Sequence, residues 1–424
     1  MTNSASDSAP AQPVLLDDIE NWNPAQASFF VDAIFRDPEM RASVQQLMRA
    51  QNTQFTSLNN LLSALWQGLT GRMKEMPVPD PQMAGALMDI ARFVETMHAT
   101  LDAYNPRTKP NPSAVFWPNP TRGGSLFDTL PAVQKIDLVS KSTPVGSAGS
   151  CFAFEIAYNL QRRGFKYVVT EKGHRPDEGV FLDSHKPDDV YERFTASYGI
   201  LFNTPSFRQL AEKAFHEREL PRLVSRRRTD DGQWMYADPY RENVFFSSVE
   251  AYQNDYEKHR TAVREGFLKS EVFIVTLGLN ECWEVVGDGS VISRNPSSSK
   301  ALNAVLKHKV LTVDENIANI QRFIDVIRAH NPKFKLIISV SPIPFLATGL
   351  AKTTHVVTAN GHSKAVLRVA AEELVRRNKD VHYLPSFELV SSCIPDAWEP
   401  DQRHVKRSSV DRVMSLFDTM FVAG

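Results

Sequence analysis

The spacing of hydrophobic and polar positions changes partway along the chain. Up to about residue 104, apolar residues recur at intervals of three or four, as in the five leucines between residues 58 and 69, which is typical of amphipathic helices. Beyond residue 112, short apolar runs alternate with helical patterns. We therefore expect an all-helical N-terminal region followed by an α/β domain.

A proline-rich stretch separates the two parts. Residues 105–112 (NPRTKPNP) hold three prolines among polar residues, a composition typical of a stiff linker. The predicted organisation is a disordered tail at 1–13, a helical region at 14–104, this linker, and a catalytic domain at 113–424.

The second part predicts a parallel sheet. Strands are expected at residues 167–169, 272–277 (VFIVTL), 336–340 (LIISV) and 381–384. Helices are expected at residues 152–163, 313–330 and 363–378. Strands separated by helices indicate βαβ units, and in such sheets a site forms outside the carboxyl ends of the strands.

Composition narrows the class of protein. The 424 residues are 42% hydrophobic, which favours a globular protein. The 48 Lys and Arg residues nearly balance the 49 Asp and Glu residues, which argues against a generally basic nucleic-acid binder. No apolar stretch of about 18 residues occurs and the N-terminus is polar, so we expect no membrane span, no secretory signal and a cytoplasmic location. The three cysteines lie far apart without a CxxC pair, and no metal site is expected.

The segment from Gly146 to Ala153 is the first candidate site. It follows an apolar run and opens a predicted helix, where N–H groups point at developing negative charge and lower the pKa of a cysteine. Ser150 or Cys151 could then act as a nucleophile. The elbow G-x-S-x-G of α/β-hydrolases is not met, because Val145 stands where its first Gly would be. A small-residue turn with Cys151 as an inert buried thiol fits the same pattern.

Two further turns carry suitable residues. Gly278 and Asn280 follow the strand at 272–277 and could present donors to an oxyanion, although Gly and Asn are also common in ordinary turns. Asp401 stands three residues before His404, a spacing that lets the carboxylate reach one ring nitrogen and leaves the other as a base. A solvated polar loop is the alternative for this pair.

The order of these motifs resembles the block order of the SGNH (GDSL-type) hydrolases and acyltransferases. A closer resemblance is to the GSCFA family, whose signature stands here as residues 149–153. Four other stretches are similar to the same family: residues 198–203 (YGILFN), 339–344 (SVSPIP), 363–368 (SKAVLR) and 383–388 (YLPSFE). The resemblance runs from about Pro112 to the C-terminus and does not include the N-terminal region.

The resemblance implies an SGNH-like three-layer α/β fold and a set of roles. The SGNH nucleophile stands two positions after Gly, which here selects Cys151 and puts Ser150 at the place of an Asp; this departure from the serine pattern leaves both residues as candidates. His404 would be the base and Asp401 would orient it. The oxyanion hole would use the N–H groups of Cys151 and Gly199 and the Asn280 amide, with Gly278 in the same turn.

The expected function is acyl-ester hydrolysis of a small-molecule or glycan ester, without a resident cofactor. A carbohydrate O-acyltransferase that takes its acyl group from acetyl-CoA is the first alternative, and a non-catalytic binding module is the second.

Other residues with reactive side chains have plainer explanations: Arg226–Arg228 in a hairpin or loop, His355 and His362 in a loop, and Cys282 and Cys393 as structural thiols.

Overall fold

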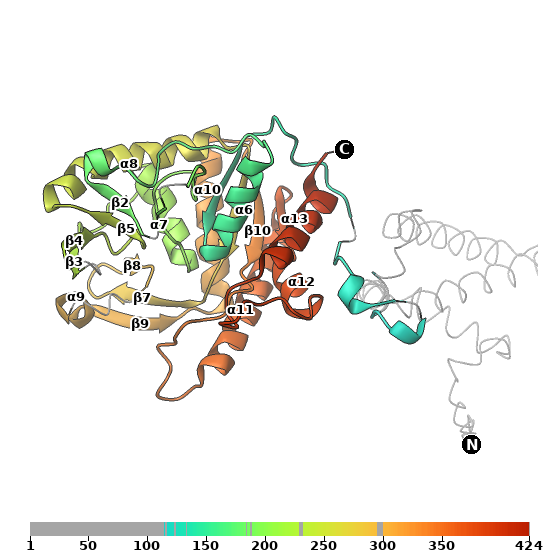
Figure 1. The fold of residues 1–424 in the computed structure, drawn as a ribbon. Coiled ribbons are helices and arrows are strands. Elements are labelled where there is room, and N and C mark those ends of the chain that lie inside the picture. The colour runs from blue at the N-terminus through green and yellow to red at the C-terminus, as the bar shows by residue number, and fades with distance from the viewer. Residues whose placement is uncertain are drawn as a thin grey trace, which may run out of the picture. The chain divides into compact units, whose positions relative to one another are not determined.

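The computed structural model describes residue 114 and residues 117–423, with gaps at 123, 133, 184, 187–188, 229–231 and 295–299. Trp117–Gly424 form one compact unit. The expected tail, helical region and linker at 1–13, 14–104 and 105–112 lie outside the described residues and stay predictions. Figure 1 shows the compact unit as an α/β structure.

A four-stranded parallel sheet forms the centre of this unit. Its order is β1-β6-β10-β11, with strands Val145–Gly149, Val272–Leu277, Lys335–Val340 and Val381–Leu384. Val272 lies opposite Val145 on one side and Lys335 on the other. The strands expected at 272–277, 336–340 and 381–384 are confirmed.

Strand β6 is apolar except for Thr276 because both faces of the sheet are covered. All six of its residues are buried. Phe273, Val275 and Leu277 pack into one core, while Val272 and Ile274 pack into the other. This alternation divides the helices into two layers.

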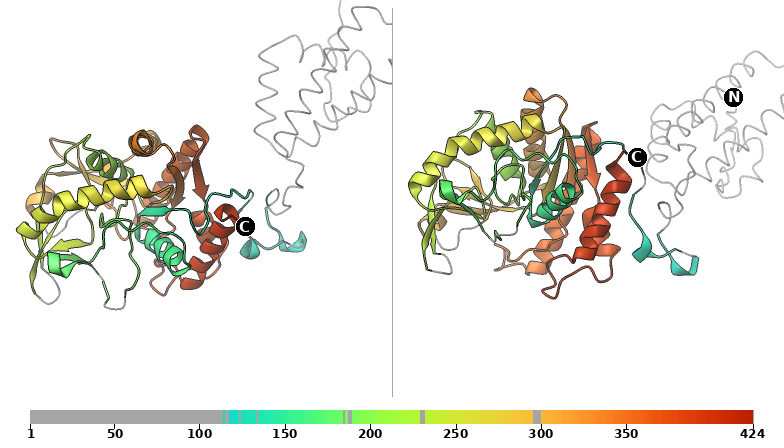
Figure 2. Two further views of the ribbon diagram at one scale, coloured as in Figure 1. Left: turned by 90° about the horizontal axis from the view of Figure 1, so that it is seen from above. Right: turned by 45° about the horizontal axis from the view of Figure 1, so that its top comes forward.

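The helices cover both faces, as Figures 1 and 2 show. One face packs against α7 (Thr204–Ala214), α8 (Val249–Lys269), α10 (Val313–His330) and α11 (Val356–Arg377). The other packs against α6 (Cys151–Arg162), α12 (Ser386–Ser392) and α13 (Arg407–Phe421). The α/β fold with a parallel sheet flanked by helices is thereby confirmed. None of the described helices is long and apolar enough to span a bilayer.

Local chemistry explains where these helices begin. Helix α10 has the predicted bounds because Thr312 and Glu315 form a capping box at its start. Helix α11 begins earlier than expected, at Val356, where the ring of His355 accepts the Val357 N–H. His362 therefore lies within a helix, and its expected place in a loop is wrong.

The strand expected at 167–169 is also wrong, since Tyr167 makes only an isolated bridge to Val145.

Two smaller antiparallel sheets were not predicted. One has the order β2-β5-β4-β3, with strands Val180–Leu182, Val244–Phe246, Trp234–Ala237 and Ser225–Arg228. The other has the order β8-β7-β9, with strands Val291–Ile292, Glu281–Val285 and Leu306–Val310. The short elements are α9 (Lys300–Ala304) and the 3-10 helices η2 (Pro120–Arg122), η3 (Leu126–Asp128) and η4 (Pro176–Glu178). The arginines from Arg226 to Arg228 lie in the β3–β4 hairpin, as expected.

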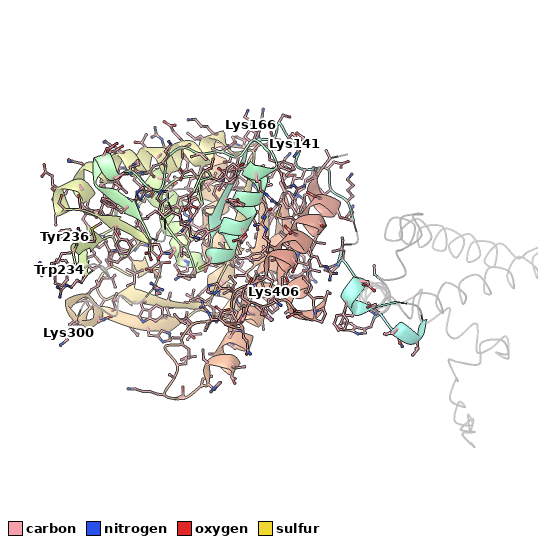
Figure 3. The ribbon with its side chains drawn as sticks, viewed as in Figure 1. Lys141, Lys166, Trp234, Tyr236, Lys300 and Lys406 are labelled. Carbon is pink, nitrogen blue, oxygen red and sulfur yellow. The ribbon has the colours of Figure 1, made fainter. Side chains whose placement is uncertain are left out.

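The two ends of the central sheet can be followed in Figure 3. Lys141 and Lys166 lie at its amino end, where the Lys166 carbonyl accepts the N–H of Val145 at the start of β1. Lys406, which precedes α13, lies at the opposite end of the domain. This is the end at which the parallel strands finish and at which the candidate motifs gather.

Candidate active site

The signature segment forms the turn between β1 and α6. Strand β1 ends at Gly149, Ser150 is the N-cap, and Cys151 is the first residue of the helix. Gly149 has φ 153°, and a Cβ there would lie 2.5 Å from the Thr276 carbonyl oxygen, so only glycine allows this approach to β6. The Ser150 N–H donates to the same carbonyl at 3.2 Å. The turn is thus fixed at the carboxyl end of the sheet.

Exposure separates the two candidate nucleophiles. Ser150 is 4% exposed, and its hydroxyl oxygen is buried with no hydrogen-bond partner among the described residues. Cys151 is half-buried. Because a nucleophile must reach its substrate, the conformation favours Cys151, the residue that the family spacing selects.

The backbone at the helix N-terminus lowers the pKa of Cys151, as expected, but burial outweighs it, so the expected net lowering of this pKa is wrong. Burial raises the pKa of the Cys151 thiol; its own backbone N–H and the charges of Arg403 and Arg294 lower that pKa, but by less. Arg294 also pairs with Glu242, whose charge raises the pKa further. Cys151 is therefore a protonated thiol at neutral pH, and attack requires a base.

Residues 198–203 lie beside this turn. The Leu201 N–H donates to the Gly149 carbonyl at 3.0 Å, and the Tyr198 hydroxyl donates to the Ser147 carbonyl. Gly199 has φ 71°, and within the described residues its N–H has no hydrogen-bond partner. This N–H is thus available as a donor close to the turn that carries Cys151.

The Gly278–Asn280 turn has most of its donors engaged. The N–H groups of Gly278 and Leu279 both donate to the Phe202 carbonyl at 2.9 Å. Asn280 is 1% exposed, and its side-chain amide donates to the Leu311 carbonyl at 3.1 Å. The Gly278 N–H is therefore not available to an oxyanion in this conformation, and the Asn280 amide has one N–H left.

A buried lysine holds the same turn, and sequence reasoning did not single it out. Lys364 is 2% exposed, and its Nζ donates to the Gly278 carbonyl at 2.7 Å. Its neighbour Ser363 accepts the Asn280 N–H at 2.9 Å. Burial lowers the pKa of Lys364 to about 7. The similarity of residues 363–368 to the family was the one feature that pointed to it.

Asp401 and His404 form a hydrogen-bonded pair. The ring Nδ1 of His404 lies 2.5 Å from Asp401 Oδ2. The other carboxylate oxygen accepts the N–H groups of His404 and Arg403 at 2.9 and 3.0 Å. These backbone donors and then the imidazole lower the pKa of Asp401 to about 2. An ionised Asp401 fixes the Nδ1–H tautomer and leaves Nε2 as the basic nitrogen.

This loop lies beside the end of β10. Arg403 Nε donates to the Pro344 carbonyl at 3.4 Å, and the Glu399 N–H donates to the His404 carbonyl at 2.8 Å. The Arg403 charge also acts on Cys151. The turns after β1, β6 and β10 and the Asp401–His404 loop thus gather at one edge of the sheet. Arg294 and Arg403 were missed, because nothing in their sequence context indicates proximity to Cys151.

The described residues include no group of three His, Cys, Asp or Glu side chains that could hold a metal ion. The side chains described at this edge include a thiol, an imidazole with its carboxylate, two guanidinium groups, the Lys364 amine and the Asn280 amide.

These features define an α/β protein with a candidate site at the carboxyl edge of a parallel sheet. The chain belongs to the GSCFA family, whose model matches residues 144–417. Two similar solved structures are a carbohydrate esterase family 3 from Talaromyces cellulolyticus (11% identity, TM-score 0.30, covering 65% of this chain and 94% of that chain) and a Clostridium thermocellum family 3 carbohydrate esterase (11%, 0.29, 66% and 95%). No curated protein matches the chain.

Proposed function

We propose that this protein is an acyl-ester hydrolase that works through a covalent acyl-enzyme on Cys151. His404 acts as the base and Asp401 orients it. The observation that carries the proposal is the Asp401–His404 pair: the backbone N–H groups of Arg403 and His404 hold the Asp401 carboxylate, and this carboxylate in turn holds the His404 ring.

The proposed reaction has two halves. His404 Nε2 takes the thiol proton as Cys151 Sγ attacks the ester carbonyl carbon, and the carbonyl electron pair moves onto oxygen. Collapse of this intermediate expels the alcohol, which receives the proton from the imidazolium, and leaves a thioester. Water, deprotonated by His404, then attacks the thioester, and Cys151 departs and regains its proton.

Backbone donors stabilise the two oxyanions in this scheme. The N–H groups of Cys151 and Gly199 and the remaining N–H of Asn280 are the candidates, and each well-placed donor typically contributes about 3 kcal/mol to the transition state. The protonated state of the Cys151 thiol supports a base-assisted attack, since no thiolate is formed in advance.

Replacement of Asp401 tests the role of the pair. We expect Asp401→Asn to lower kcat for p-nitrophenyl acetate at least about 100-fold with little change in KM, because the wrong tautomer is then favoured. Asp396→Asn is the control, since Asp396 is an exposed aspartate that pairs with Lys406 near the same loop. Equal activity of the two variants would contradict the proposal. Labelling by acetyl-CoA in place of the ester would point to the transferase chemistry of the same site.

A further inference from the structure

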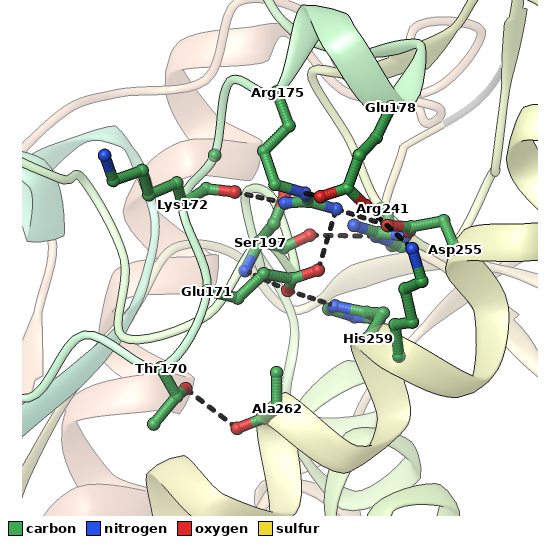
Figure 4. Close-up of polar contacts among 12 residues, drawn as sticks. Thr170, Glu171, Lys172, Arg175, Glu178, Ser197, Arg241, Asp255, His259 and Ala262 are labelled. Atoms are coloured by element: carbon green, nitrogen blue, oxygen red, sulfur yellow. Dashed lines mark hydrogen bonds and ion pairs between the residues drawn. The ribbon is translucent and has the colours of Figure 1, made fainter.

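A buried cluster of charged side chains contacts Ser197, the residue before the 198–203 segment, as Figure 4 shows. Its members come from the loop after β1–α6, from the turn before β5 and from α8: Glu171, Arg175, Arg241, Asp255 and His259. Their side chains are between 2% and 13% exposed. None of them belongs to the catalytic set proposed above.

The cluster is held together by ion pairs. Arg241 Nη1 lies 2.5 Å from Asp255 Oδ2, and Arg175 pairs with both Asp255 and Glu171. His259 Nδ1 lies 2.7 Å from Glu171 Oε2. Burial alone would raise the pKa of Glu171, but His259, Arg241 and Arg175 hold it far below its usual range. Glu171 is therefore ionised and accepts the His259 N–H.

Such a cluster is a poor source of stability by itself. Removing several charges from water costs about as much as their mutual attraction returns, and well-packed apolar residues often do better. Arg241 Nη2 and Ser197 Oγ are moreover buried without hydrogen-bond partners among the described residues. The directed contacts that the cluster makes to the backbone offer a better explanation for its presence.

Those contacts hold the peptide groups on either side of Gly199. The Ser197 N–H donates to Glu171 Oε2 at 2.8 Å, and Arg241 Nε donates to the Ser197 carbonyl at 2.8 Å. The Ile200 N–H donates to the carbonyl of Glu242, the neighbour of Arg241, at 3.1 Å. A Cβ on Gly199 would lie 2.2 Å from the same carbonyl oxygen. The chain is thus fixed before and after Gly199, while the N–H of Gly199 has no partner among the residues that the structure describes.

We propose that the cluster is a positioning device that fixes the Gly199 peptide, so that its N–H serves as an oxyanion donor beside Cys151. The Leu201 N–H bond to the Gly149 carbonyl completes the connection from the cluster to the nucleophile turn. Glu171 and Arg241 act through Ser197 and touch no substrate. The catalytic half of this inference rests on the proposed function; the structural half does not.

Amide hydrogen exchange of the full chain tests the structural half. In the wild type, the amides of Ser197, Ile200 and Leu201 are expected to exchange slowly because all three are bonded. Glu171→Gln removes the charge that holds Ser197, and we expect exchange in this segment to accelerate at least about 10-fold. Glu178→Gln is the matched control, because Glu178 contacts the same Arg175 at 3.7 Å from an exposed position. Exchange that Glu171→Gln leaves unchanged would overturn the proposal.

Kinetics test the catalytic half. We expect Glu171→Gln to lower kcat about 10-fold or more with KM nearly unchanged, whereas Glu178→Gln keeps wild-type values. If Glu171→Gln does not fold, Arg241→Lys keeps the positive charge while removing the Nε donor to Ser197, and the same two measurements apply. Faster exchange without a fall in kcat would refute the positioning role. A wild type that forms no acyl-enzyme would defeat the proposed function, while the exchange result would still decide whether the cluster fixes this peptide.

Discussion

At the scale of single residues, burial distinguishes the two side chains that the sequence leaves as candidate nucleophiles. The family spacing selects Cys151, but the departure from the serine pattern keeps Ser150 as a candidate, and spacing contains no information on which side chain reaches solvent. The structure buries the Ser150 hydroxyl and leaves Cys151 half-buried. Burial also reverses the pKa shift expected from a helix N-terminus, since removing a thiolate from water outweighs the backbone N–H and the two arginine charges.

Alkylation by iodoacetamide tests this protonation state. Only the thiolate reacts, so a raised pKa means that the rate at Cys151 keeps rising with pH beyond about 8.5, the ordinary thiol value. Cys151 should nevertheless react faster than Cys282 and Cys393, which are buried. Peptide mapping after timed labelling between pH 7 and 10 gives the three rates. A Cys151 rate that is already level at pH 7 would show a preformed thiolate and contradict the account.

At the scale of elements, prediction succeeded where a segment is long and strongly patterned. The six-residue, largely apolar β6 and the capped, amphipathic α10 have the bounds that the sequence indicates. The small sheets were missed because strands such as β2 and β5 have three residues each and depend on pairing with one another across distant parts of the chain. Lys364 and Arg241 were missed for a related reason: tertiary packing alone buries them.

Lys364 predicts a dependence of stability on pH. An unfolded lysine keeps its proton up to about pH 10, whereas burial gives the folded one a pKa of about 7. The cost of burying the charge is therefore fully present below pH 7 and is lost as the pH rises from 7 to about 10. Relative to wild type, Lys364→Met should gain most in free energy of unfolding at or below pH 7 and progressively less above it.

Urea unfolding of both proteins at pH 7 and pH 9.5 measures this difference. Lys333→Met, which changes an exposed lysine, is the control and should show no comparable trend. A Lys364→Met difference that stays constant over this range would mean that the folded protein keeps this lysine charged.

At the scale of the whole molecule, the described domain joins its own two ends. The N–H groups of Ile136, Leu138 and Val139 donate to the carbonyls of Met420 and Phe421, and the Ala423 N–H donates to the Val139 carbonyl.

A fragment that begins at Pro112 keeps this pairing, and we expect it to unfold cooperatively with the stability of an intact domain. A fragment that begins at Lys141 lacks the pairing and should be less stable. Circular dichroism during urea unfolding measures both, and a molten Pro112 fragment would place part of the core before residue 112.

The central claim is that Cys151 carries the acyl group. The most direct measurement is the mass of the intact protein after brief incubation with p-nitrophenyl acetate and an acid quench, followed by peptide mapping of the wild type, Cys151→Ala and Ser150→Ala. We predict one acetyl group on Cys151 in the wild type and in Ser150→Ala, and none in Cys151→Ala. An acetyl group on Ser150, or one that persists in Cys151→Ala and disappears in Ser150→Ala, would contradict the account and make the serine the nucleophile.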